Sequence, residues 1–267
     1  MDIEEFRKIV LSNYRQAGRE FPWRGTTPWG VLVSEFMLQQ TQTERVIPYW
    51  EKWMELWPQP DALAAASMED ALRAWSGLGY NRRCYNLKYS AVAIVKDHGG
   101  QVPDTPKALR SLAGIGPYIA GAVACFAYNH PSVFIETNIR STIIHCFFPD
   151  RDNITDAEIF PILEAALDRK DPRTWYYALM DYGAALKKLT VNPNRRSAHY
   201  SRQSPFIGSI RQARGKVIRT LASMGPSNAE EIKIVSGLGE EKLYLVLDRL
   251  KKESLVAETE GIYRIKD

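Results

Sequence analysis

The chain has 267 residues, 45% of them hydrophobic, so it can bury a sizeable core in one large domain or in two to three small ones. Its 35 Lys and Arg against 31 Asp and Glu give a net charge of +4, which permits binding to nucleic acid without requiring it. No apolar run approaches the roughly 20 residues that cross a bilayer, and the acidic start is unlike a secretory signal, so we expect an intracellular protein with no membrane partner.

The first predicted elements are a helix and an aromatic turn. Residues 2–18 carry apolar side chains at helical spacing and end at Gly18, which predicts an amphipathic helix. The turn over residues 21–25 then presents Trp23 and Arg24 together. A tryptophan in such a turn more often packs than acts in a site, so the residues alone leave its role open.

An acid lies in the next predicted helix. Residues 29–42 are apolar on almost every side, as in a core helix, yet they include Glu35. Burial disfavours the charged form of a carboxyl group, so a buried Glu35 would stay protonated near neutral pH and serve as a general acid. The alternative is that Glu35 lies on the one solvated stripe of this helix.

A glycine-flanked turn comes next. Three helices are expected before it, over residues 46–57, 61–66 and 68–75. The turn places Tyr80 after Gly77 and Gly79, and Arg82 and Arg83 follow. An exposed aromatic ring can replace base stacking when a nucleotide leaves a duplex, and arginines can hold phosphates. Tyr80 would equally well cover the hydrophobic core.

Residues 108–127 read as a helix, a hairpin turn and a second helix. Gly114, Ile115 and Gly116 interrupt the helical pattern, and Pro117 begins the second helix. The two glycines allow positive φ angles and expose backbone N–H groups beside a helix N-terminus, which suits an anion such as a DNA phosphate. The same turn also occurs as an ordinary helix C-cap.

A second acid follows the apolar run at residues 133–135. Glu136 directly precedes Thr137-Asn138-Ile139-Arg140 and is expected at the start of a helix. An acid at a helix N-terminus is ordinary dipole chemistry, so its position does not by itself indicate a catalytic role.

Two more helices and a basic loop follow, and the three cysteines of the chain indicate no metal site. Further helices are expected over residues 161–167 and 175–186, followed by a basic loop over 187–202 that either contacts phosphate or is simply solvated. Cys84, Cys125 and Cys146 are widely spaced and odd in number, so they are expected to be buried free thiols.

The last 60 or so residues are predicted to combine helices with a β-hairpin. Helices are expected over residues 210–222, 227–235 and 240–252, the second capped by Ser227, and a hairpin of 255–259 with 262–265 follows. This order resembles a winged helix, a module of DNA-binding and of protein-interaction domains.

One run carries a specific resemblance. Ser34-Glu35-Phe36-Met37-Leu38-Gln39-Gln40-Thr41-Gln42 closely resembles the S-E-x-M-L-Q-Q-T-Q signature of MutY-type adenine DNA glycosylases, within the helix-hairpin-helix (HhH-GPD) superfamily. Residues 112–116 resemble the superfamily's L-x-G-[IV]-G turn, and residues 77–80 its G-L-G-Y element. Glu136 stands where the superfamily has a catalytic Asp. The resemblance covers roughly residues 1–200.

The resemblance implies an all-α helix-hairpin-helix glycosylase fold, with two helical domains and the active site in the cleft between them, plus the winged-helix-like α/β module. Residues 1–24 and 135–204 are expected to form one domain, equivalent to the cluster domain of relatives. Residues 25–134 are expected to form a six-helix domain with the hairpin, and residues 205–267 the C-terminal module.

The resemblance also implies catalytic roles. Glu35 is implied to protonate N7 of a flipped-out adenine, and Glu136, beside Asn138, to stay ionised against the charge that develops on the sugar. Tyr118 stands where bifunctional relatives carry a Schiff-base lysine, so little or no strand cleavage is expected. The base pocket is expected from Trp23, Arg24 and Asp181, and DNA contacts from Gln39, Gln40, Thr41, Tyr80, Arg82, Arg83, Gly114, Ile115 and Gly116.

Departures from the family keep alternatives open. Most relatives bind a [4Fe–4S] cluster through four cysteines that residues 186–196 lack, so no cofactor and no metal are expected. The expected substrate is double-stranded DNA with a mismatched or damaged base, above all adenine opposite 8-oxoguanine or guanine. The expected reaction is hydrolysis of the N-glycosidic bond of that base, a step of base excision repair. The enzyme is expected to be a monomer in the cytoplasm or on the nucleoid. Glu136, the missing cluster and the replaced Nudix-like C-terminal domain leave mismatched thymine or uracil possible. A non-catalytic DNA-binding protein is the rival class, which the two acids argue against.

Overall fold

The computed structural model describes residues 1–202 and 205–266. The chain forms two compact units, of which unit 1 comprises Met1–Val31, Pro103–Ser111 and Ile115–Gln203, and unit 2 comprises Leu32–Val102, Leu112–Gly114 and Ser204–Asp267. These boundaries differ from the domain boundaries predicted from the sequence. Residues 115–134 group with unit 1, because α8 contacts α7 and α11, and the C-terminal module groups with residues 32–102, because α12 contacts α5.

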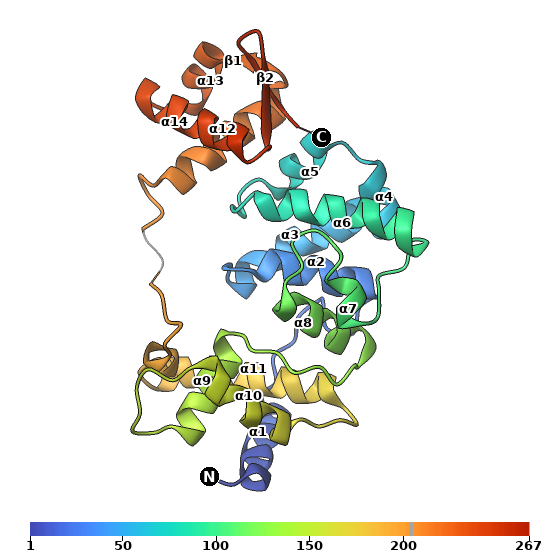
Figure 1. Ribbon diagram of the computed structural model, residues 1–267, viewed down its shortest axis with the longest axis vertical. Coiled ribbons are helices and arrows are strands. Elements are labelled where there is room, and N and C mark those ends of the chain that lie inside the picture. Colours follow the sequence, from blue (N-terminus) through green and yellow to red (C-terminus); the bar gives the residue numbers. More distant parts are fainter. Residues whose placement is uncertain (203–204, 267) are drawn as a thin grey trace. The chain divides into compact units, whose positions relative to one another are not determined.

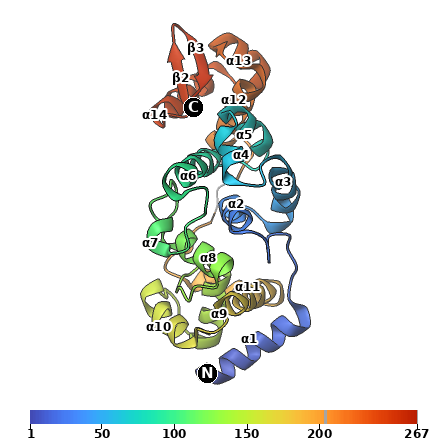
Figure 2. The ribbon, with the colours of Figure 1, turned by 90° about the vertical axis from the view of Figure 1, so that its right-hand side faces the viewer.

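Unit 1 is a helical bundle in which α9 and α11 lie side by side and α1 lies along α11 (Figures 1 and 2). Its elements are α1 (Ile3–Ala17), α7 (Pro106–Leu109), α8 (Pro117–Tyr128), α9 (Thr137–Phe147), α10 (Asp156–Ala166), α11 (Pro172–Leu189) and the 3₁₀ helix η1 (Pro193–Arg196). Phe6 of α1 meets Trp175 of α11 edge-on in the core, with ring centroids 5.7 Å apart.

Two helices of unit 1 are longer than expected. The α10 helix begins before Pro161, because Thr155 and Glu158 form a reciprocal capping box that satisfies its first N–H groups. The α11 helix runs on to Leu189, so Lys187 and Lys188 belong to a helix rather than to a basic loop.

The helical part of unit 2 surrounds a tryptophan cluster in which the rings of Trp53 and Trp75 pack edge-on, with centroids 5.4 Å apart. Its helices are α2 (Pro28–Leu38), most of which lies in this unit, α3 (Thr43–Leu56), α4 (Pro60–Ala65), α5 (Met68–Trp75) and α6 (Arg82–His98). The expectation that α2 reaches residue 42 is wrong: it ends at Leu38, and Gln40 has a left-handed backbone with φ 53°. The α6 helix, which begins directly after the glycine-flanked turn, is not among the helices predicted from the sequence.

The C-terminal module contributes the remaining helices and the strands of unit 2. These are α12 (Ile210–Met224), β1 (Ser227–Asn228), α13 (Ala229–Ser236), α14 (Glu240–Lys252), β2 (Val256–Thr259) and β3 (Ile262–Ile265). The strands form an antiparallel sheet in the order β1-β3-β2. The three helices and the terminal hairpin are confirmed, but Asn228 caps α13 with Glu231, and Ser227 lies in the strand instead.

The module is attached to the rest of unit 2 through α12, which lies against α5 (Figure 2). Tyr85 of α6 donates its hydroxyl proton to the carbonyl of Leu255 at 2.6 Å, a buried contact across 170 positions of sequence. No helix among the described residues is both long and apolar enough to cross a membrane.

Candidate active site

Glu35 is a buried acid on a buried helix. Its exposed fraction is 4%, and its neighbours Ser34, Phe36 and Met37 are each 1% exposed or less. The α2 helix is therefore buried on every side at this level, as the continuous apolar run predicts. The solvated-stripe alternative for Glu35 is excluded by this burial.

Arg83 fixes the end of α2. Its guanidinium donates to the carbonyls of Phe36 at 2.9 Å, Met37 at 2.7 Å and Gln39 at 2.7 Å, which the helix terminus leaves without intrahelical partners. Burial lowers the Arg83 pKa to about 10, so the group stays charged at neutral pH. The expected phosphate contact for Arg83 is wrong, because a side chain 6% exposed holds the Gln39–Thr41 turn instead.

Two aromatic side chains hold the Gly77–Tyr80 turn through hydrogen bonds to backbone carbonyls. Tyr49 donates to the carbonyl of Ser76 at 3.1 Å, and the indole of Trp75 donates to the carbonyl of Gly79 at 3.0 Å. A Cβ at Gly77, where φ is 110°, would lie 2.0 Å from the Tyr49 hydroxyl, so this position requires glycine. Tyr80 is half-buried and itself left-handed, with φ 50°.

The hairpin glycines differ from one another. Gly114 has φ +73°, and a Cβ there would lie 2.2 Å from the side-chain amide of Asn86. Gly116 has an ordinary φ of −84° and caps α8, and no atom lies within 4 Å of its Cβ position. Ile115 is buried between them. Gly114 therefore serves the turn itself, whereas the positive φ expected at Gly116 is wrong.

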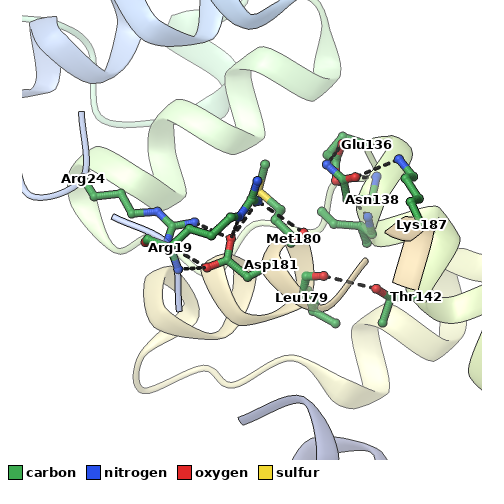
Figure 3. A network of polar contacts seen from close by, with 10 residues as sticks. Arg19, Arg24, Glu136, Asn138, Thr142, Leu179, Met180, Asp181 and Lys187 are labelled. Atoms are coloured by element: carbon green, nitrogen blue, oxygen red, sulfur yellow. Dashed lines mark hydrogen bonds and ion pairs between the residues drawn. The ribbon is translucent and has the colours of Figure 1, made fainter. Parts of the chain in front are cut away.

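Glu136 caps α9, as expected. Its Oε1 accepts from the backbone N–H groups of Asn138 at 2.6 Å and Ile139 at 2.8 Å, and its Oε2 accepts from the Asn138 side-chain amide at 3.2 Å (Figure 3). Lys187 of α11 donates to the other end of that amide, the Asn138 Oδ1, at 2.7 Å. The carboxyl group is thus surrounded by donors in a fixed orientation.

Opposing influences act on the Glu136 carboxyl. Burial raises its pKa above 4.5, while the N–H groups of Asn138 and Ile139 and the charges of Lys187 and Arg140 act in the opposite direction. Burial likewise lowers the pKa of Lys187. Lys187 was missed as part of this constellation, although the helical spacing that continues past Leu186 would have placed it on α11.

Gly183 allows α11 to approach this cap. A Cβ on it would lie 2.1 Å from the backbone oxygen of Asn138. One turn away, Thr142 donates to the carbonyl of Leu179 at 3.1 Å (Figure 3). The close approach brings Lys187 within reach of Asn138.

Asp181 is engaged by two arginines. Its carboxylate accepts from the backbone and side chain of Arg19, and from both terminal nitrogens of Arg24 at 2.8 and 3.0 Å (Figure 3). The Asp181 side chain is 1% exposed and accepts from four nitrogens of Arg19 and Arg24. These bonds hold the aromatic turn in place and do not provide the contact to the base that was expected of Asp181. Trp23 is buried and stacks on Phe21 at 5.1 Å. Arg24 lies 4.3 Å from the Tyr177 ring centroid.

Tyr118 occupies the first turn of α8. It is half-buried and meets Phe134 edge-on, with ring centroids 6.0 Å apart. A phenol at this position offers no amine for a Schiff base.

The three cysteines do not fit an iron–sulfur cluster. Cys84, Cys125 and Cys146 are buried free thiols, as expected, and they lie on α6, α8 and α9. Burial raises the pKa of Cys146 to about 11, which disfavours the thiolate that a metal needs. Within the described part of the chain, no group of His, Cys, Asp and Glu is arranged to hold a metal ion.

The salt bridge that joins α9 to α10 makes stability depend on pH. Arg140 donates to both oxygens of Asp156, at 2.7 and 2.8 Å, and this bond lowers the Asp156 pKa below 3.8. Because the folded pKa is depressed, the stabilisation is complete above pH 3.8 and disappears as pH falls through the folded value. We expect Asp156→Asn to cost about 1–2 kcal/mol at pH 7, or about 2–8 °C in Tm.

Thermal unfolding of both proteins between pH 3 and pH 8 checks this. The difference in Tm should be constant at neutral pH and shrink below pH 3.8. An equal loss at pH 3 would mean that the ion pair contributes nothing.

Known proteins resemble this chain along most of its length. Residues 33–167 match the model of the HhH-GPD superfamily base excision DNA repair protein. An adenine DNA glycosylase of Mycobacterium tuberculosis is 34% identical, over 94% of this chain and 90% of its own length. That alignment necessarily reaches into the C-terminal module.

Solved structures share the fold. A thermostable thymine-DNA glycosylase superimposes with a TM-score of 0.59 and 23% identity, over 68% of this chain and 87% of its own. An endonuclease III trapped as a covalent intermediate with DNA gives a TM-score of 0.59 and 15% identity, over 77% and 91%.

Proposed function

The chain belongs to the HhH-GPD superfamily of base excision DNA repair proteins, and we propose that it is an adenine DNA glycosylase, which hydrolyses the bond between adenine and deoxyribose in DNA. The observation that carries this proposal is Glu35, an acid 4% exposed within the Ser34–Gln42 run. The 34% identity to a protein named adenine DNA glycosylase supports it. The proposed substrate is a duplex with adenine opposite 8-oxoguanine or guanine, and the proposed active form is a monomer.

In the proposed reaction two acids divide the work. Glu35 gives a proton to N7 of adenine, and adenine leaves with the electron pair of the glycosidic bond. The sugar takes on positive charge, which the Glu136 carboxylate stabilises, and water adds at C1′ and loses a proton. The N–H groups of Asn138 and Ile139 hold Glu136 in place for this role.

A base must leave the stack before an enzyme can act on it. We assign Gln39, Gln40, Thr41 and Tyr80 to the place that the base vacates, and Arg82 and the hairpin of Gly114, Ile115 and Gly116 to phosphates. Two of these residues, Gln40 and Tyr80, have left-handed backbones, a strained conformation that tends to persist at functional sites. Tyr118 has no amine, so strand cleavage is not part of the proposal.

The proposed activity uses no iron–sulfur cluster, because three buried cysteines on three helices cannot supply four thiolates. The capping network of Glu136, Asn138 and Lys187 joins the start of α9 to α11 through protein side chains alone.

Base release from four duplexes tests the function. With A:8-oxoG, A:G, T:G and U:G pairs under single-turnover conditions, we expect release from the two adenine substrates. Release from T:G or U:G alone would support the mismatch-thymine or uracil alternative. No release from any of them, with duplex binding intact, would support a non-catalytic DNA-binding protein.

Gly116→Ala should weaken DNA binding while leaving the protein folded. The added Cβ meets no protein atom within 4 Å and the φ of −84° suits alanine, so only a ligand would be obstructed. Losing one backbone contact to phosphate should weaken affinity about two- to tenfold, as measured by fluorescence anisotropy.

Gly239→Ala is the matched control, since Gly239 also caps a helix and also faces open space. Wild-type affinity in Gly116→Ala at several salt concentrations would remove the phosphate role of this hairpin.

A further inference from the structure

A cavity of about 730 Å³ lies within unit 2, where the C-terminal module meets the Gly77–Tyr80 turn. Gln40 and Tyr80 line one side of it, and α12 lines the other with Arg211, Lys216 and Arg219. The volume falls in the range of roughly 300–1,000 Å³ that small-molecule and nucleotide sites occupy. The cavity therefore joins two proposed DNA-contacting residues to a module whose role is unassigned.

The lining is strongly basic. Seven Lys and Arg residues line the cavity against one acid, Glu253, whereas the whole chain has a net charge of only +4. Arg83 is occupied by the end of α2, and Arg214 forms a bidentate ion pair with Glu253. The other five cations of the lining are Arg82, Arg211, Lys216, Arg219 and Arg249.

Neutral groups orient three of these cations. Arg82 donates to the backbone carbonyl of Glu253 at 2.6 Å, Arg219 to the hydroxyl of Ser76 at 3.0 Å, and Arg211 to the hydroxyl of Tyr80. All three acceptors are neutral. The Glu253 carboxylate interacts electrostatically with Arg82 and Arg249 as well as with Arg214, but one carboxylate against seven cations leaves the lining with a net positive charge. Such a concentration of positive charge attracts an anion.

The cavity also presents aromatic surface. The Arg211 guanidinium lies 5.1 Å from the Tyr80 ring centroid and 5.3 Å from that of Phe206. Arginine above an aromatic ring and an adjacent stacking surface are the elements with which proteins hold single nucleotides. The left-handed backbones of Gln40 and Tyr80 indicate that the geometry on this side is maintained against local strain.

We propose that this cavity binds a nucleotide of the DNA substrate, with the base against Tyr80 and the phosphates held by Arg82, Lys216, Arg219 and Arg249. The C-terminal module is then part of the DNA-binding surface, through α12 together with the end of α14. This inference rests on the proposed function only in that the ligand is the same duplex.

Salt-dependent binding of the full chain tests the proposal. The test variant carries Lys216→Gln, Arg219→Gln and Arg249→Gln, which line the cavity. The control carries Lys252→Gln, Arg264→Gln and Lys266→Gln, which remove the same charge from exposed positions of the same module outside the cavity. Comparing thermal unfolding of both variants with the wild type ensures that only folded proteins are compared.

Each phosphate contact contributes about 0.9 to the slope of log affinity against log salt. Between 50 and 200 mM salt, the wild-type affinity for an A:8-oxoG duplex should therefore fall about 40-fold more than that of the test variant. The control should keep the wild-type slope. Equal slopes for test variant and wild type, or equal losses in test and control variants, would overturn the proposal.

The two proposals fail separately. If the wild type releases adenine and the test variant binds DNA as the wild type does, the cavity is not a DNA site while the function stands. If the wild type releases no base but the test variant loses its salt dependence, the function fails and the cavity remains a DNA site.

Discussion

Replacing Glu35 by glutamine is expected to slow adenine release by about 10²–10⁴-fold while leaving duplex affinity nearly unchanged. The amide has almost the shape of the acid, so the buried site around it keeps its packing. It cannot deliver a proton to the leaving base, and without that proton adenine is a poor leaving group. Single-turnover release from an A:8-oxoG duplex measures the rate, and fluorescence anisotropy measures the affinity.

Glu55→Gln provides the matched control, because Glu55 is an exposed acid on α3 in the same unit. It should release adenine at the wild-type rate. Turnover of Glu35→Gln within about tenfold of the wild type would reject Glu35 as the general acid, since acid catalysis contributes more than that.

Glu136→Gln is expected to slow adenine release on the order of 10²–10³-fold, because it removes the charge that opposes the developing positive charge on the sugar. Its amide oxygen can still accept from the Asn138 and Ile139 N–H groups, so α9 keeps its cap. Glu136→Asp retains the charge but moves it by about 1 Å, an error worth on the order of 10²-fold unless the backbone compensates. Aspartate is also a favourable N-cap residue, so a slow Glu136→Asp protein is not explained by a lost helix start.

Asp171→Asn is the control for the cap itself. Asp171 caps α11 in the same unit, where its side chain accepts from the N–H of Thr174. It should lose a little stability and no rate. Full activity in Glu136→Gln would place the stabilising charge on another residue.

The pH profile follows from the same residue. Burial raises the Glu136 pKa above 4.5, and the charged form is the active one in the proposed mechanism. The rate should therefore fall as pH is lowered through this raised value, so that the acid limb lies above the ordinary range of a glutamate. The residual activity of Glu136→Gln should lack this limb.

Much of the local structure could be predicted from the sequence. The α5 helix has the predicted bounds, Glu136 lies at the predicted helix start, and the C-terminal module has the predicted helices and hairpin. These features depend on caps, turn glycines and apolar spacing, which act between residues only a few positions apart. The family signature around Glu35 belongs to the same class of short-range information.

Other features depended on the tertiary structure. Arg83 looked like a phosphate ligand, but it holds the carbonyls at the end of α2, 44 to 47 positions away. Asp181 looked like a base contact, but it binds arginines about 160 positions away. The sequence around a charged residue is the same whether its partner in the folded protein is a DNA phosphate or a buried carbonyl, so the sequence does not identify the partner.

The sequence by itself therefore determined most of the helices, the two acids and the family, whereas only the tertiary structure decided which charged side chains are used internally. The difference has a physical cause. Helix starts and turns are set by hydrogen bonds within one or two turns of chain, while a guanidinium reaches several ångströms and bonds to whatever carbonyl or carboxylate folding brings near. For Arg83, Asp181 and the basic residues of α12, that neighbour comes from a distant part of the chain.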